Sequence, residues 1–394
     1  MFYQQDSNLC TTLLAKTRLS FCWRFFISLQ IFLLGGYFLN SPNQVAAQDM
    51  VAGKTRAQWI EIVKKEGSSD NLRRAGVAAL AIFGITYDDV DKTLATLLAE
   101  DKAEVVRNQV LITLANSKKA DLSRWANRLA DTLKNDKSPR LRQQAVFVLG
   151  RMEELAKPAL SNIISACKDS VPNVRAAAVE CLSKTGATAK SIIPVILPLL
   201  KDENWQVRLN SVLALGRLES LASETIPNLI QMLDTEKEAS VRLEIIRDFG
   251  MIGTDSSVVP ILVKIVKSDL NAENRQTAAL SLGKMKKAAS SSTMTLLEIL
   301  QNDSDATVRT YLVRELPKIS VDQLKVLVTP FANQLIKETN YNVKVAIIEE
   351  LGAMGTLAID ALPALKKAQD DISVEIRNEA KLAIKKISPP KTKK

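Results

Sequence analysis

Acidic and basic side chains recur in register along most of this chain. The pattern returns at intervals of 33 to 35 residues, and an acidic residue stands six positions before the basic one in nine of ten cases. The basic residues, here called anchors, are Arg73, Arg107, Arg142, Arg175, Arg208, Arg242, Arg275, Arg309, Lys344 and Arg377. The acidic residues are Asp101, Asp136, Asp169, Asp202, Glu236, Asp269, Asp303, Glu338 and Asp371. Carboxylates and guanidinium groups at a fixed spacing could exchange protons or hold an anion.

The recurrence of this pair favours a structural role over a catalytic one. An active site occurs once, whereas this pair is repeated along the chain. Each acid falls near the N-terminus of a predicted helix, where unpaired N–H groups and the helix dipole favour negative charge. We expect the arginine to bridge to the acid of its own unit or of an adjacent one. The clearest members of this predicted ladder are Asp136, Arg142, Asp169, Arg175, Asp202, Arg208, Asp303 and Arg309.

Other residue types that commonly do chemistry are missing or isolated. The chain has no histidine, which is the commonest general base and transition-metal ligand. It also lacks a phosphate-binding glycine loop, a nucleophile elbow and a metal-spaced cysteine set. Cys167 and Cys181 fall on neighbouring antiparallel helices, roughly 10 Å apart at a rise of about 1.5 Å per residue, so we predict two separate buried thiols. We therefore expect no catalytic residue, cofactor or metal, and a protein that is not an enzyme.

The first 47 residues are typical of a secretory signal peptide. Lys16, Arg18 and Arg24 precede an apolar run over residues 25–39, and small residues end the segment at Ala47. The run has about 15 apolar positions, fewer than the ~20 needed to span a bilayer. The alternative is an uncleaved membrane anchor over residues 25–39. We predict cleavage after Ala47 and export to the periplasm or the extracellular space.

The charge that remains after cleavage favours an acidic partner. The whole chain has a formal net charge of +10, and residues 1–47 carry three basic residues and one acidic residue, so +8 remains. Such a balance attracts polyanions. In an exported protein, an envelope polyanion or an acidic protein is a better candidate than nucleic acid.

A period near 34 residues is typical of stacked helical units that share one continuous core. In one unit we expect a first helix over residues 192–200, with Pro194 in its opening turn, and a second helix over residues 205–218. Val207, Ser211 and Leu215 then form one buried stripe of the second helix. The sequence therefore predicts an all-α solenoid of about ten two-helix repeats.

Glycine and proline recur at fixed places in these units. Glycines eleven residues after the anchor predict left-handed helix ends at Gly84, Gly186, Gly253 and Gly355. Glycines eight residues after it predict a close approach of neighbouring helices at Gly150, Gly216, Gly250, Gly283 and Gly352. One unit has Pro317 at that position, which should shorten or bend its second helix.

The repeated pattern resembles the HEAT repeat, in its short, phycobilisome-lyase HEAT-like form. The best matches are Asp169-Val174-Arg175-Ala178-Leu182 and Asp202-Val207-Arg208-Leu215-Gly216, and the resemblance covers about residues 55–387. The segment from Gly53 to Trp59 is similar to the start of exported bacterial members. The resemblance implies a right-handed, armadillo-like α-solenoid whose second helices line a concave surface that binds other macromolecules.

A possible binding surface follows from the residues nine positions after the anchor. Six of these ten residues are basic. We predict a partner-binding row formed by Arg151, Lys184, Arg217, Lys284 and Lys318. The alternative is that these cations only complement the C-terminal ends of their helices. A mixed set of small and polar residues two positions after the anchor is expected at the surface, where it suits either a recognition face or plain solvent exposure.

We interpret the sequence as an exported, non-enzymatic scaffold or adaptor that binds a protein through its concave face, and the net charge favours an acidic partner. It comprises a signal peptide over residues 1–47, a solenoid over 48–387 and a basic disordered tail over 388–394. We expect a monomer without nucleic acid that meets a membrane only if the N-terminal segment is uncleaved. One alternative is a bilin lyase or isomerase that uses Cys167 or Cys181. The other is a nucleic-acid-binding protein with a basic groove, whose binding would weaken strongly with salt.

Overall fold

The computed structural model describes residues 50–252 and 256–388. The expected signal peptide and nearly all of the expected tail lie outside these residues. The described part opens on a two-stranded sheet of β1 (Met50–Val51) and β2 (Lys54–Thr55). Helix α2 (Arg56–Lys64) follows, and its N-terminus is closed by a capping box between Thr55 and Gln58. Trp59 and Val63 are the buried residues of this opening helix.

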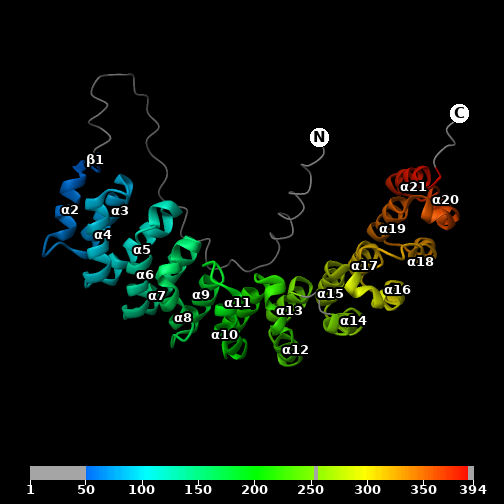
Figure 1. Ribbon diagram of the computed structural model, residues 1–394. Helices are drawn as coiled ribbons and strands as arrows, with labels where there is room; N and C mark the ends of the chain where they lie inside the picture. Colours follow the sequence, from blue (N-terminus) through cyan, green and yellow to red (C-terminus); the bar gives the residue numbers. More distant parts are fainter. Residues whose placement is uncertain (1–49, 253–255, 389–394) are drawn as a thin grey trace, which may run out of the picture. The chain divides into compact units, whose positions relative to one another are not determined.

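The rest of the described chain is a succession of helix pairs joined by short loops and 3-10 helices (Figure 1). After α2, the first helices are α4 (Asp88–Glu100), α6 (Ala126–Asn135), α8 (Leu160–Ala166), α10 (Ala189–Ile196), α12 (Ile226–Thr235), α14 (Val259–Ser268), α16 (Thr293–Asn302), α18 (Lys325–Lys337) and α20 (Leu362–Ala368). The second helices are α3 (Asp70–Phe83), α5 (Glu104–Asn116), α7 (Pro139–Met152), α9 (Pro172–Leu182), α11 (Trp205–Gly216), α13 (Ala239–Ile252), α15 (Ala272–Met285), α17 (Ala306–Ile319), α19 (Tyr341–Ala353) and α21 (Val374–Ile387). The 3-10 helices are η2 (Lys119–Leu122), η3 (Glu153–Ala159), η4 (Leu197–Lys201), η5 (Glu219–Thr225), η6 (Ser256–Val258), η7 (Lys286–Ser292) and η8 (Gly355–Ala361).

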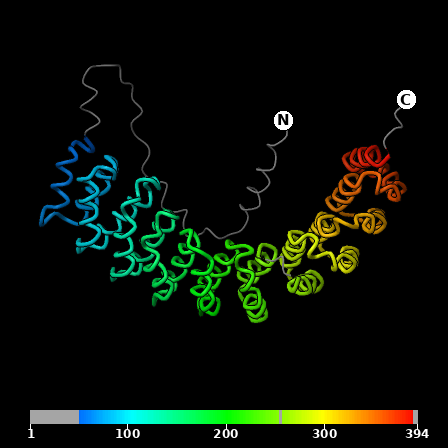
Figure 2. The backbone as a smooth tube through the Cα atoms, in the orientation of Figure 1, coloured from blue at the N-terminus to red at the C-terminus, as the bar shows by residue number. Residues whose placement is uncertain are grey.

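The helices form two layers. Each second helix packs against the second helices before and after it, and first helices pack on the other side of that row (Figures 1 and 2). The core lies between the layers, and Val207, Ser211 and Leu215 are all fully buried in it. The structure thus confirms the all-α solenoid of two-helix units, and it confirms this stripe as the buried one.

The glycines eight residues after the anchor lie where neighbouring second helices meet. A Cβ atom added to Gly250 would stand 2.7 Å from Cα of Ser281, and one added to Gly352 would stand 3.1 Å from Cα of Ala383. These contacts confirm the predicted close approach, since a side chain at either position would push the next helix away.

The backbone turns sharply at the position eleven residues after the anchor. Gly84, Gly186 and Gly355 have positive φ there, as predicted, while Gly253 lies outside the described residues. Three units adopt positive φ at this position without glycine, at Glu153, Glu219 and Lys286. This conformation is costly for residues with a side chain, and the sequence pattern did not reveal it.

Several predicted details differ in the structure. Helix α10 begins at Ala189, because the chain already makes helical hydrogen bonds to the carbonyl of Thr188, so Pro194 lies inside the helix. Helix α11 ends at Gly216, two residues early, and the backbone then turns at Glu219. Helix α17 is not shortened by Pro317, because a proline in the last turn removes only one backbone donor.

Candidate binding face

The anchors form a ladder of ion pairs between successive units. Arg107 holds the carboxylate of Asp136 through Nε (2.9 Å) and Nη2 (3.2 Å), and Arg175 holds Asp202 through the same two atoms, both at 2.8 Å. In each case the acid belongs to the following unit, 27 to 29 residues on. Most other arginine anchors pair likewise, whereas Lys344 holds Asp371 through Nζ alone (2.7 Å) and Arg242 stands 3.7 Å from Asp269. Arg377, the last anchor, has no acid partner among the described residues.

Each arginine anchor also contacts its own unit. Nη1 of Arg175 donates to the backbone carbonyl of Asp169 at 2.9 Å, six residues earlier. The carboxylate of that same Asp169 accepts the backbone N–H of Val171 at 2.9 Å. One arginine therefore holds the loop between the helices of its own unit and forms a bidentate ion pair with the acid in the loop of the next unit.

The ladder favours ionised acids. Burial disfavours the charged form of Glu338. Hydrogen bonds donated by Arg309, by the backbone N–H of Asn340 and by the side chain of Gln334 outweigh this effect, and they lower the pKa of Glu338 to about 2. Desolvation likewise opposes the charge of Asp202, yet Arg175 and the N–H of Asn204 hold the pKa of this carboxyl below its usual range. These ion pairs stabilise the stack of units.

The predicted basic row lies on the second helices, on the side turned away from the first helices. We call this side the second-helix face. Arg151, Arg217, Lys284 and Lys318 are exposed there, and Lys184 is half-buried. Arg151, Lys284 and Lys318 belong to the last turns of α7, α15 and α17, whereas Lys184 and Arg217 follow the ends of α9 and α11.

The cations of this row differ in how far they are neutralised. Lys184 pairs with Glu180 at 2.6 Å, Lys318 pairs with Glu315 at 2.8 Å, and Arg217 donates to the hydroxyl of Ser183 at 2.7 Å. Within residues 50–252 and 256–388, neither Arg151 nor Lys284 takes part in a hydrogen bond or an ion pair.

Buried acids lie beneath the row, which the sequence pattern missed. Asp248 and Glu315 stand six residues after their anchors, and each packs against the close-approach glycine of the preceding second helix, Gly216 and Gly283 respectively. Both side chains are nearly inaccessible. Their places in the repeat could have revealed them, since the same position holds Ala214 and Cys181 in other units.

Asp248 has no counter-charge in direct contact. Its Oδ2 atom is buried without a hydrogen-bond partner among the described residues. Burial, together with the nearby charge of Glu244, raises its pKa well above the ordinary value, although Arg247, Lys284 and Arg217 oppose this shift. Burial also raises the pKa of Glu244, against the influence of the same three cations.

The remaining residues of the second-helix face change in character along the chain. Those two positions after the anchor are mostly half-buried, and Glu244 and Ala346 are buried, so the expectation of a solvent-facing row there was wrong. The reason is that they contact the preceding second helix, as Asn210 does by donating to the carbonyl of Ala176 at 2.8 Å. Residues five after the anchor are more exposed, among them Phe147 and Arg314.

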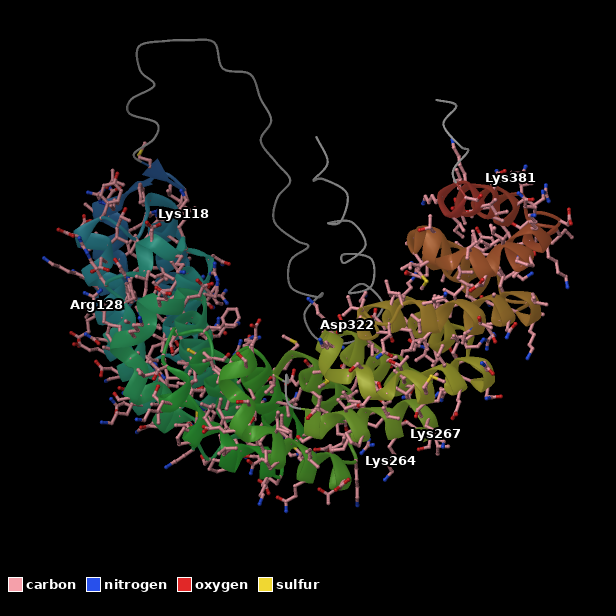
Figure 3. All side chains as sticks on the ribbon, turned by 45° about the vertical axis from the view of Figure 1, so that its right-hand side comes forward. Lys118, Arg128, Lys264, Lys267, Asp322 and Lys381 are labelled. Carbon is pink, nitrogen blue, oxygen red and sulfur yellow. The ribbon has the colours of Figure 1, made fainter. Side chains whose placement is uncertain are left out.

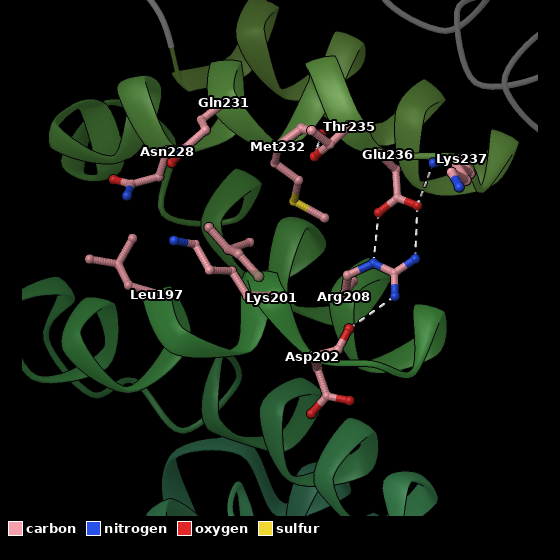
Figure 4. A pocket seen from close by; sticks show the side chains of 11 residues that line it. Leu197, Lys201, Asp202, Arg208, Asn228, Gln231, Met232, Thr235, Glu236 and Lys237 are labelled. Carbon is pink, nitrogen blue, oxygen red and sulfur yellow. Dashed lines mark hydrogen bonds and ion pairs between the residues drawn. The ribbon is translucent and has the colours of Figure 1, made fainter.

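The first-helix side carries grooves where successive units meet. Figure 4 shows one of about 430 Å³ between η4 and α12, bounded by Lys201 and Asn228 and ending at the Arg208–Glu236 ion pair. Similar grooves of about 780, 260 and 380 Å³ lie between other pairs of first helices. Because they recur at equivalent places, we attribute them to stacking and not to one ligand site.

Comparison with protein families agrees with this architecture. A profile of HEAT repeats matches residues 126–192, 226–316 and 293–385, and a second HEAT repeat profile matches residues 192–221. Together these matches cover more than half of the chain. The chain belongs to the HEAT-repeat family. The anchors from Arg142 to Arg377 lie within these matches. The resemblance to the HEAT repeat is therefore confirmed, whereas the matches do not test its phycobilisome-lyase-like form or its exported type. No curated protein matches the sequence.

Solved structures show the same fold. An engineered protein aligns with a TM-score of 0.52 and 16% identity over 84% of this chain and 98% of its own. Yeast importin-β (Kap95p) gives 0.54 and 14% over 84% of this chain and 53% of its own. Kap121p bound to Pho4p gives 0.56 and 15% over 85% of this chain and 41% of its own. The HEAT chain thus spans about half the length of importin-β and less of Kap121p, and at these identities the likeness concerns the fold.

Two further findings concern the described residues alone. None of their helices is both long enough and apolar enough to span a membrane. They also contain no cluster of three or more acidic or cysteine side chains arranged to hold a metal ion.

Proposed function

We propose that this HEAT protein is an exported, non-enzymatic scaffold that binds an acidic protein segment through its second-helix face. The observation that carries the proposal is the exposed basic row, in which the side chains of Arg151 and Lys284 make no hydrogen bond or ion pair within the described chain, although Lys284 acts electrostatically on the buried acids Glu244 and Asp248. Unpaired cations on an ordered face are available to an incoming carboxylate, and they raise the rate of encounter with an acidic partner.

The ladder and the row differ in a way that supports this assignment. The ladder residues are equivalent from unit to unit and are satisfied by each other. The second-helix face is not repetitive, because Ile82, Asn116 and Met251 interrupt the cations at equivalent positions. A surface that varies between units is suited to one partner, and a related solenoid, Kap121p, has been solved with Pho4p bound.

The thiols oppose the lyase alternative. Cys167 and Cys181 are free and buried, as predicted. Burial raises the pKa of each thiol to about 12. A thiol that is protonated and covered is a poor nucleophile for attachment of a chromophore.

Export is tested by fractionating cells and sequencing the N-terminus of the native protein. We expect a mature chain that begins at Gln48 in the periplasmic or secreted fraction. An intact N-terminus in the membrane fraction would instead indicate an anchored scaffold. A cytoplasmic pool would contradict export.

The binding row is tested by affinity capture from an envelope extract with the mature protein as bait, followed by quantitative mass spectrometry. Reversing the two unpaired cations in Arg151→Glu/Lys284→Glu should reduce capture of the specific partner by about tenfold or more, since each lost charge-assisted contact costs about 1 kcal/mol. The matched control is Lys190→Glu/Lys267→Glu, which makes the same change in charge at exposed positions of α10 and α14. Equal capture by both double variants would contradict the proposal.

A further inference from the structure

The last described second helix, α21, carries basic residues where the other second helices carry their core. Four residues after the anchor, the other nine units place a fully buried aliphatic residue or alanine. These residues are Val77, Leu111, Val146, Val179, Val212, Ile246, Ala279, Val313 and Ile348. In α21 the same position is Lys381, which is exposed (Figure 3).

This side of a second helix faces the following unit. In α13, the carbonyl of Ile246 accepts a hydrogen bond of 2.8 Å from Ser281 of α15, and Gly250 touches the backbone of that serine. Ile246 and Gly250 correspond to Lys381 and Lys385 of α21, and both lysines are exposed. Within the described residues no unit packs against this side of α21, and we call this exposed side the end face.

The ladder also reaches this end face. Nη1 of Arg377 donates to the carbonyls of Asp371 (2.7 Å) and Ile372 (2.9 Å), as in the preceding units. The guanidinium group is therefore held in the orientation that the other anchors have. In other arginine anchors, Nε and Nη2 bind a carboxylate of the next unit. In Arg377 these two atoms contact no carboxylate among residues 50–252 and 256–388.

Three cations thus stand in line along α21. Arg377, Lys381 and Lys385 are spaced by four residues, or about 6 Å along the helix axis. The acidic residue Glu375 points elsewhere, because it accepts a hydrogen bond from Tyr341 of the preceding second helix. A helix whose carboxylates are also spaced by four residues matches this line of charges.

We propose that this end face docks an acidic helical segment of a partner protein, one carboxylate of which is gripped by Nε and Nη2 of Arg377. The repeated geometry of the ladder favours a carboxylate over other anions, because the same guanidinium orientation holds Asp or Glu in the preceding arginine units. The two lysines then pair with acids one and two turns further along the partner helix. This site is distinct from the second-helix face, so the two proposals stand independently.

The test measures binding of a fluorescently labelled 15-residue helical peptide with glutamate at every fourth position, by fluorescence anisotropy at low salt. The mature chain should bind this peptide at least tenfold more tightly than the same peptide with glutamine. Arg377→Gln/Lys381→Gln/Lys385→Gln should bind the glutamate peptide about tenfold or more weakly. The matched control, Lys190→Gln/Lys264→Gln/Lys267→Gln, should bind it as the unmodified protein does.

Two further variants separate a specific grip from general charge attraction. Arg377→Lys keeps the charge but loses the two-pronged contact, so it should weaken binding several-fold, whereas Lys381→Arg should not. Lys381→Gln/Lys385→Gln leaves the loop contacts of Arg377 intact and should still weaken binding, so weaker binding cannot be attributed to a folding defect at the loop.

Unchanged peptide binding in the α21 variants overturns the proposal. It is equally overturned if phosphatidylglycerol vesicles, and not the peptide, bind in a manner that depends on these residues. Arg151→Glu/Lys284→Glu should leave peptide binding unchanged, which keeps the two sites distinguishable.

Discussion

Two buried carboxylates of the second-helix face lie in equivalent places but in different electrostatic surroundings. Glu315 is compensated by Lys318 on the same helix. In α13 the residue that corresponds to Lys318 is Met251, so Asp248 has no cation of its own one turn away. The cost of burying the charge of Glu315 is therefore offset by Lys318, whereas the cost of burying the charge of Asp248 is not offset by a cation on its own helix.

We predict that Asp248→Asn stabilises the protein at pH 7 by about 1–3 kcal/mol, because the amide keeps the shape of the side chain and removes the uncompensated buried charge. The pKa of Asp248 is higher in the folded than in the unfolded state. Its penalty is therefore complete above the folded pKa and disappears as the pH falls through that value towards the unfolded one. Urea unfolding at pH 7 and pH 5 should show the advantage of the variant shrinking at the lower pH.

The comparison for this prediction is Glu315→Gln. This change removes an acid that Lys318 already compensates, so it should lower the unfolding free energy at pH 7. An equal response of both variants would mean that the partner on the same helix is unimportant.

At the scale of helices, the close-approach glycines are not equivalent. A Cβ on Gly250 would stand 2.7 Å from Cα of Ser281, whereas one on Gly150 would stand 3.6 Å from Cα of Cys181, an ordinary contact. Backbone atoms cannot move aside as a flexible side chain can. The same substitution should therefore have opposite effects at the two sites.

We predict that Gly250→Ala destabilises the protein by about 1–3 kcal/mol, the typical cost of overpacking. Gly150→Ala should stabilise it by about 0.5–1 kcal/mol, because alanine is the better helix former. Chemical denaturation of both variants measures the difference. A loss of stability in Gly150→Ala would show that helix spacing at α7 and α9 is tighter than the structure has it.

The turn that opens η7 is strained at one side chain. Lys286 has φ 51° and ψ −128°, which glycine adopts easily and lysine does not. We predict that Lys286→Gly raises the unfolding free energy by about 1 kcal/mol. Thermal unfolding measures this gain, and Ala288→Gly in the same 3-10 helix is the control, which should lose stability.

The elements show how far the sequence alone can be interpreted. The periodicity of the anchors predicted the units, the buried stripe and the close-approach glycines, because each depends on a spacing along one helix. The start of α10 was predicted too late, because Pro194 was taken to mark the first turn. The helix begins earlier in the chain, where backbone hydrogen bonds to Thr188 already form. The buried acids were missed because each helix was interpreted alone, whereas comparison of the sixth position after the anchor between units could have revealed them. The strained turns at Glu153 and Lys286 were missed because nothing in those side chains signals positive φ.

For the whole molecule, the ladder links each unit mainly to its neighbours. In such a stack, stability is close to a sum of units and of interfaces between them, so one weak interface can separate two parts of the array. Glu338 lies at such an interface, between the helix pairs α16–α17 and α18–α19.

We predict that Glu338→Gln lowers stability by about 1–3 kcal/mol and that α19 and α21 then lose hydrogen-exchange protection before α7 and α9. Because the folded pKa of Glu338, about 2, lies below its ordinary value, its stabilisation is complete above pH 4.5 and is lost as the pH falls through about 2. The difference between the variant and the unmodified protein should shrink accordingly in acid. Uniform loss of protection along the chain would contradict a local effect.

The direction of the ladder gives the array a polarity. Every linked unit presents a guanidinium or ammonium group to the unit after it and a carboxylate to the unit before it, as Arg175 and Asp169 do within one unit. Units are thus interchangeable only in one orientation and only as wholes. If one complete unit is removed, the cation of the unit before it meets the acid of the unit after it, as in the original ladder. If half a unit is removed, a cation or an acid is left without its partner on each side of the cut. The molecule can therefore change its length in steps of one unit without breaking the order of charges in the ladder.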